Sequence, residues 1–446
     1  MNSEKQNTEN IDNIYRLDGR VPLLKAIPFG LQHVLAMFVS NLAPITIVAA
    51  AAQPAISQEQ VGMLLQNAMF VAGLATLIQL YPIWKIGSGL PIVMGVSFTF
   101  VTILCTTAAN YGYPTVVGAV FVGGILEGTL GLFGRRIFRF IKPIVAACVV
   151  SGIGLSLFTV GVRSFGGGYS DDFGSPANLF IGTVTLVVCI IWSFFVKGYL
   201  KQLSVLAGLI VGYIISIFLG KVDLSTIMTG GLISFPHFLM FIPKFNIGSI
   251  LSVFLIFMVS ATETIGDTTA MVSSGLKREI TTDEISGSLA VDGYASSISS
   301  LFGCPPVTSF SQNVGLISMT KVVNRFTIMT GAVAMILGGL IPPIGNFFAS
   351  LPQPVLGGCT IMMFGQILVS GIQMIAACGF DQRNIAIASL SLALGAGLTA
   401  SSEQDIWKAF PQVIQDVFSN NIVAVVFIIA MILSYILPEE KKKDNG

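Results

Sequence analysis

Charged residues are scarce in this sequence. Lys, Arg, Asp and Glu together make up 10% of the 446 residues, whereas soluble globular proteins carry roughly 25%. Hydrophobic residues make up 53%, so the composition excludes an ordinary soluble protein and favours one whose solvent is the lipid bilayer. The formal net charge is +1, which excludes a nucleic-acid partner, because such a partner requires a concentrated basic surface.

Metal-binding and catalytic motifs are also absent. The six cysteines stand singly in apolar stretches, without a C-x-x-C pair or a histidine at ligand spacing, and we interpret them as buried free thiols. The sequence contains no G-x-S-x-G turn, no H-E-x-x-H motif and no glycine loop for phosphates or dinucleotides. It therefore predicts a protein that is not an enzyme and holds no metal or other cofactor, so that active transport would depend on an ion gradient.

Apolar stretches close to the ~20 residues needed to cross a bilayer recur along the chain, and we count fourteen between residues 28 and 437. The polar first 25 residues lack the pattern of a cleaved signal peptide. With the N-terminus in the cytoplasm, 19 of the 23 Lys and Arg residues fall on the cytoplasmic side, as the positive-inside rule requires. We expect an all-α, multi-pass protein of the cell membrane with both termini cytoplasmic.

Two predicted spans, 90–105 and 308–320, are too short and too interrupted for ordinary lipid-facing helices. Each is marked by a cluster of glycine and proline: the first opens with Gly87, Gly89 and Pro91, and the second follows Gly303, Pro305 and Pro306. Paired broken segments are typical of inverted-repeat transporters, in which non-helical backbone inside the membrane lines the substrate site. The two segments are the third and the tenth span, so we expect a 7+7 inverted repeat.

Four acidic residues fall inside predicted spans: Glu127, Glu263, Asp267 and Asp292. A carboxylate in mid-bilayer costs at least ~2.5 kcal/mol, so it normally faces the helix bundle or a cavity. Glu263 and Asp267 stand one helical turn apart and share a face, which suits groups that load and release a proton. Helix-to-helix hydrogen bonding alone is the alternative for Asp267 and Asp292. For Glu127, we expect an interfacial ion pair with Arg135 or Arg136.

The two histidines differ in setting. His33 follows Gln32 early in the first span, where the pair places two polar side chains in the bundle core. A packing role for His33 is the alternative to a functional one. His237 lies in a loop rich in aromatic residues, and we expect it to be solvated or interfacial.

The segment SQNVGLISMTKVVNR resembles the signature of the nucleobase–ascorbate (nucleobase–cation symporter 2) family. The matching positions are Gln312, Asn313, Gly315, Thr320 and Lys321. Residues typical of the same family occur in other predicted spans: Gln32-His33 in the first, Ser97-Phe98 in the third, Glu263 and Asp267 in the eighth, and Asp292 in the ninth. The resemblance extends from about residue 20 to residue 437.

This resemblance implies a core domain and a gate domain. The core domain would comprise residues 26–142 and 247–350, with spans 1–4 and 8–11. The gate domain would comprise residues 143–246 and 351–438 and form a homodimer contact, and cytosolic tails would lie at 1–25 and 439–446. Substrate would bind between the third and tenth spans, whose extended stretches offer backbone groups.

The resemblance also assigns roles to individual residues. Glu263 and Gln312 would be the principal substrate-binding side chains, with Phe98, Ser97 and Ser311 contributing backbone and shape. The coupling or supporting positions would be Asp267, Asp292, Asn313, His33 and Gln32. A carboxylate accepts two N–H bonds, whereas a Gln amide accepts one and donates one, so Glu263 with Gln312 complements an oxo-purine such as xanthine or urate.

The sequence therefore predicts an ion-coupled symporter that imports a nucleobase, with a proton favoured over a sodium ion. Uracil-type members of the family tend to carry Glu in place of Gln312, so a purine is favoured over uracil. Members restricted to xanthine often carry Asn near the position of Ser97, so the serine here leaves urate as a candidate substrate beside xanthine. An anion carrier of the sulfate/bicarbonate type is the alternative, although an acid at the binding span opposes it. A membrane-embedded enzyme or sensor is the third class.

Overall fold

The computed structural model describes residues 11–133, 142–228, 231–400 and 406–438. Within these ranges the chain is helical apart from two three-residue strands and the connecting segments. The predicted tail at 439–446, the first ten residues of the predicted tail at 1–25, and both Arg135 and Arg136 lie outside the described residues.

One group of helices contains both broken segments. It consists of α1 (Leu23–Ala51), α2 (Gln58–Leu80), β1 (Met94–Val96), the 3-10 turn η2 (Phe98–Phe100), α3 (Val101–Tyr111), α4 (Tyr113–Phe133), α8 (Ile247–Met271), α9 (Thr282–Leu301), β2 (Val307–Ser309), α10 (Ser311–Thr320), α11 (Arg325–Gly338) and α12 (Pro342–Ala349). In this group α4 packs along α9 and α8, and α2 packs against α11 and α12.

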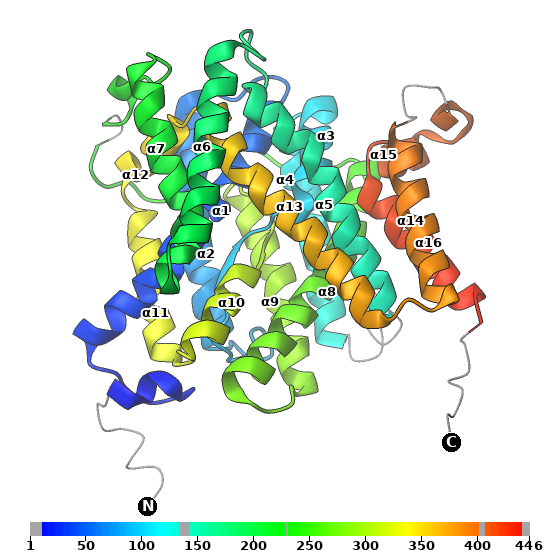
Figure 1. Ribbon diagram of the computed structural model, residues 1–446, viewed down its shortest axis with the longest axis horizontal. Coiled ribbons are helices and arrows are strands. Elements are labelled where there is room, and N and C mark those ends of the chain that lie inside the picture. Colours follow the sequence, from blue (N-terminus) through cyan, green and yellow to red (C-terminus); the bar gives the residue numbers. More distant parts are fainter. Residues whose placement is uncertain (1–10, 134–141, 229–230, 401–405, 439–446) are drawn as a thin grey trace, which may run out of the picture.

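The remaining helices pack chiefly on one another. They are α5 (Pro143–Gly166), α6 (Pro176–Phe195), α7 (Ser204–Phe218), α13 (Gln353–Cys378), α14 (Gln382–Ala400), α15 (Gln412–Phe418) and α16 (Ile422–Ile436). Helix α13 lies along α5, and α14 and α16 stand side by side at one edge of the molecule (Figure 1). Helix α15 is the exception, because it packs mainly on α8 of the first group.

Local sequence signals set several helix ends. Helices α2 and α9 each begin with a capping box, Ser57 with Gln60 and Thr281 with Glu284, which satisfies backbone N–H groups that lack an intrahelical partner. Helices α5, α6 and α13 carry proline in their first turn, where its missing N–H costs nothing.

By length and composition, eight helices of the described residues can cross a membrane, or up to ten if each bent pair is one span. The pairs are α11–α12, bent by 81°, and α15–α16, bent by 96°. Among the predicted spans that do not pass, α3 has 11 residues, α10 has 10 and α7 has 15. Helices enclosed by other helices need be neither long nor uniformly apolar, so the fourteen-span count stays a prediction.

Close packing of α4 on α9 depends on glycine. A Cβ atom at Gly124 would lie 2.5 Å from the carbonyl oxygen of Gly293, and one at Gly293 would lie 2.1 Å from the backbone nitrogen of Gly128. Only residues without a side chain allow two helix backbones to approach this closely. The two helices therefore form one rigid pair.

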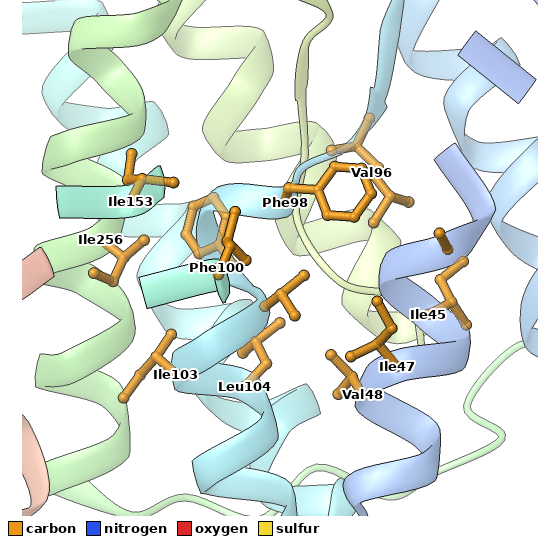
Figure 2. Close-up of a cluster of buried hydrophobic side chains, with 14 of the residues drawn as sticks. Ile45, Ile47, Val48, Val96, Phe98, Phe100, Ile103, Leu104, Ile153 and Ile256 are labelled. Atoms are coloured by element: carbon orange, nitrogen blue, oxygen red, sulfur yellow. The ribbon is translucent and has the colours of Figure 1, made fainter. Parts of the chain in front are cut away.

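An apolar cluster surrounds the first broken segment (Figure 2). Its side chains come from α1, β1, η2, α3, α5 and α8 and include Ile45, Val96, Phe98, Leu104, Ile153 and Ile256. Phe98 meets Phe364 of α13 in an edge-to-face contact, with ring centroids 5.2 Å apart. Phe98 therefore links the two helix groups at the start of η2.

Candidate functional site

The two broken segments meet in a short antiparallel ribbon. Met94 pairs with Ser309, Gly95 with Thr308 and Val96 with Val307. The prediction of extended stretches at these two positions is confirmed. Glycine and proline flank both strands and prevent a continuous helix, because proline lacks the N–H that a helix interior needs.

Side chains from neighbouring helices bind the outer edges of this ribbon. Asn41 of α1 accepts from the backbone nitrogen of Val96 at 2.7 Å, and Thr76 of α2 accepts from that of Met94 at 2.9 Å. Ser296 of α9 accepts from the backbone nitrogen of Val307 at 3.0 Å. These three strand N–H groups are therefore already bonded within the protein, and the expectation that the extended stretches offer backbone groups to substrate stays a prediction for the other groups.

Free backbone donors occur instead at the helix starts that follow the strands. Helix α10 begins at Ser311 and η2 at Phe98, and the first N–H groups of a helix have no intrahelical partner. Because the strands are antiparallel, the two helix starts lie at opposite ends of the ribbon. Each start carries the positive end of its helix dipole.

Helix α8 presents one acid to each of these helix starts. Glu263 Oε2 accepts a 2.7 Å hydrogen bond from Thr99 Oγ1 in η2. Asp267 Oδ2 accepts from Ser309 Oγ at 2.8 Å and from Ser311 Oγ at 2.9 Å. The structure therefore brings together Glu263, Asp267 and Ser311, as predicted, and adds Thr99 and Ser309, which the sequence analysis missed.

Asp292 lies deeper in the same network. It is fully buried on α9 and accepts a hydrogen bond from Thr264 of α8. Thr264 Oγ1 also lies 3.2 Å from Ser309 Oγ, which in turn donates to Asp267. Two hydroxyl groups supply only two protons. All three contacts are hydrogen bonds only if Asp292 or Asp267 supplies a third proton.

The signature residues lie where α10 meets α1. Asn313 Nδ2 donates to the backbone oxygen of His33 at 3.2 Å, so α1 and α10 are joined through that carbonyl group. Gln312 is half-buried, and its Oε1 atom has no hydrogen-bond partner among the described residues. The same holds for Gln32 Nε2 and for Nδ1 of the buried His33. Unpartnered polar atoms thus occur together where α10 meets α1.

The other two substrate-binding positions lie at the start of η2. Ser97 Oγ accepts from the backbone nitrogen of Thr99 at 3.3 Å and caps η2. Phe98 is buried against Phe364. Ser97 therefore acts on the local backbone, and Phe98 forms an apolar wall next to it.

The expectation that Glu127 is interfacial is wrong. This residue is fully buried in α4, and neither carboxyl oxygen has a hydrogen-bond partner in the part of the chain that the structure describes. The expected ion-pair partners, Arg135 and Arg136, lie outside the described residues, so the ion pair stays a prediction. His237 is half-buried, and its backbone bonds to the buried side chain of Asn67 on α2.

Two cavities lie between the helix groups, near opposite ends of α5. One, of about 500 Å³, reaches Arg163 near the end of α5 and Thr102 on α3. The other, of about 830 Å³, reaches Pro143 at the start of α5 and Ile265 on α8. Thr102 follows Thr99 by one turn, so the first cavity comes within one helical turn of η2. Ile265 stands two residues from each acid of α8, so the second cavity lies along a different face of that helix.

A multi-pass helical fold with paired broken segments defines a membrane transporter rather than an enzyme. Residues 24–404 match the permease family. The chain is 35% identical to the xanthine permease XanQ of Escherichia coli strain K12, with 97% of this chain and 96% of that protein covered. The chain therefore belongs to this permease family, and the resemblance noted in the sequence is confirmed.

Solved structures with a similar fold come from anion transporters. The transmembrane domain of the cyanobacterial bicarbonate transporter BicA has a TM-score of 0.55 and 14% identity, covering 92% of this chain and 97% of that chain. The murine anion transporter Slc26a9 in its inward-facing state has a TM-score of 0.63 and 10% identity, covering 95% and 70%. At these identities the likeness extends to the fold alone.

Proposed function

We propose that this protein is an ion-coupled symporter that imports an oxo-purine such as xanthine or urate. The observation that carries the proposal is the placement of Glu263 and Asp267 at the two helix starts of the ribbon. Glu263 can accept two N–H groups of a planar base, and the unpartnered amide of Gln312 can pair with a second edge. Free N–H groups at the helix starts suit the carbonyl oxygens of the ring.

Substrate type follows from the same groups. XanQ, the relative named above, is a xanthine permease, and an amide at Gln312 suits a purine edge better than a second carboxylate would. The fold shared with anion transporters keeps an anion carrier as the second candidate. Two acids at the ribbon oppose it, because an anion site needs helix starts without competing carboxylates.

A proton is the coupling ion that the site supports best. The hydrogen bonds that join Asp292, Thr264, Ser309 and Asp267 need one proton more than the hydroxyl groups supply. We therefore assign the coupling role to these acids, with Asn313, His33 and Gln32 supporting the junction of α1 and α10.

The two helix groups supply the moving parts of the cycle. We assign the group around the ribbon to a core domain and the group around α5 and α13 to a gate domain, in a 7+7 inverted repeat of fourteen spans. The cavities at the two ends of α5 would be the two access routes. The protein would lie in the cell membrane with both termini cytoplasmic, as a homodimer joined through the gate domain.

The experiment that tests this function is uptake into proteoliposomes. Labelled xanthine, urate, uracil and ascorbate are offered with an imposed pH or sodium gradient, with and without a protonophore. We expect uphill uptake of a purine that the protonophore abolishes. Glu263→Gln keeps the shape of the side chain but loses its proton, so it should abolish accumulation. If Glu263→Gln accumulates purine as the wild type does, Glu263 is not part of the coupling mechanism. If the wild type takes up sulfate or bicarbonate but no purine, the anion carrier is favoured.

A further inference from the structure

Glu127 is the buried acid that the proposed transport site does not use. It lies on the face of α4 that carries Gly124 and Gly131, because residues three and four positions apart share a helix face. This face packs against the backbone of α9 at Gly293 and Ala290. Glu127 is fully buried there, and within the described residues both of its carboxyl oxygens lack a hydrogen-bond partner.

An ionised carboxylate in that position would be very unfavourable. Burial of an isolated charge without hydrogen bonds costs many kcal/mol, so such a group takes up a proton or shares one with a neighbour. The close contact between the α4 and α9 backbones leaves no room for solvent between them at Gly293. The position of Glu127 therefore requires a proton nearby in at least part of any cycle.

Asp292 is the partner that the structure offers. It is the titratable group on α9 whose charge acts on Glu127, and the charges of Glu263 and Asp267 on α8 act in turn on Asp292. One oxygen of Asp292 accepts from Thr264, and among the described residues the other, Oδ1, is buried without a side-chain partner, although the backbone N–H of Ser309 also acts on this carboxyl group. Glu127 and Asp292 are therefore neighbouring acids at one helix contact, and within the described residues neither has a charged partner of opposite sign.

We propose that Glu127 and Asp292 share a proton and that Glu127 is the inner residue of the proton-coupling network. When the proton passes from a carboxyl oxygen of Glu127 to a carboxylate oxygen of Asp292, the O–H bond of Glu127 breaks, an O–H bond of Asp292 forms, and the single negative charge stays within the pair, so neither acid bears it without a proton next to it. From Asp292 the network continues through Thr264 and Ser309 to Asp267 at the ribbon. The coupling role of Glu127 rests on the proposed proton-coupled transport. The shared proton between Glu127 and Asp292 does not depend on that proposal.

The shared proton is tested on the purified protein by infrared difference spectroscopy, which separates a protonated carboxylic acid from a carboxylate. We expect a protonated-acid band that disappears in Glu127→Gln and shifts in Asp292→Asn. Ser297→Ala is the matched control, because Ser297 bonds across the same helix pair to the backbone oxygen of Phe121 at 2.9 Å without titrating. A spectrum that Glu127→Gln leaves unchanged would overturn the proposal, whatever the protein transports.

The coupling role is tested by transport in proteoliposomes. Glu127→Gln should retain purine binding, measured by ligand-induced thermal stabilisation, and should retain exchange of labelled for unlabelled purine, while pH-driven accumulation is lost. Glu127→Asp, which keeps a carboxyl group if Gln is not tolerated in folding, should accumulate purine with a shifted pH profile. Ser297→Ala should behave like the wild type. Full accumulation by a folded Glu127→Gln, or an unshifted pH profile in Glu127→Asp, would refute the coupling role.

Discussion

Thr99 offers a direct measure of how much the orientation of Glu263 contributes to transport. Thr99→Val replaces the hydroxyl with a methyl group of similar size, so the apolar packing around η2 is preserved. The substitution removes the 2.7 Å hydrogen bond to Glu263 Oε2. Thr99 is only 6% exposed, so water has little access to replace the lost donor.

The magnitude follows from the charge on the acceptor. A hydrogen bond to a charged group contributes roughly 1.5–3 kcal/mol. Each 1.4 kcal/mol is a factor of about ten in affinity, so the KM for xanthine or urate should rise roughly tenfold to a hundredfold. Thr99→Ser keeps the donor and should stay close to the wild type.

The assay is the initial rate of labelled purine uptake, measured against concentration in cells with matched amounts of protein in the membrane. The comparison of Thr99→Val with Thr99→Ser separates loss of the hydroxyl from loss of the methyl group. If Thr99→Val keeps the KM of the wild type, Glu263 does not depend on Thr99 for its orientation. A matching rise in KM for Thr99→Ser would instead indicate a packing defect in η2.

Two further predictions concern substrate recognition and orientation. Gln312→Glu should weaken the affinity for xanthine or urate by ~1–3 kcal/mol, the cost of one mispaired buried hydrogen bond. The affinity is measured by competition between labelled purine and unlabelled uracil in uptake. An unchanged purine affinity would show that Gln312 does not contact the substrate. In a cysteine-free background, Ser225→Cys should react with an impermeant maleimide in intact cells, whereas Phe138→Cys, outside the described residues, should not. Labelling of the second position alone would reverse the orientation.

The positions of the broken segments could be predicted because the cause is local. Gly89, Pro91, Pro305 and Pro306 are clustered and disfavour a helix locally, and the structure has strands and short helices there, whereas single prolines such as Pro28 and Pro44 are accommodated inside α1. The pairing of the two strands could not be predicted in the same way. It depends on Asn41, Thr76 and Ser296 from three other helices, and their hydrogen bonds to the strands leave no pattern in either segment.

Glu127 shows where a sequence argument failed. Nearness in sequence to two arginines suggested an interfacial ion pair, but nearness along the chain says little about which face of a helix is buried. Gly124 and Gly128 carried the better signal, since small residues at that spacing indicate a close helix contact. A carboxylate on the same face as Gly124 should have been placed at the contact.

The ribbon has a consequence for how the chain is built into a membrane. Its two strands belong to opposite halves of the sequence, and unpaired backbone groups are not tolerated in lipid. During synthesis, residues 94–96 emerge long before residues 307–309 exist, so the early strand needs temporary shelter from lipid by water, by α1 and α2, or by the insertion machinery. Membrane integration of the first half is therefore provisional until the tenth segment arrives and completes the hydrogen bonds.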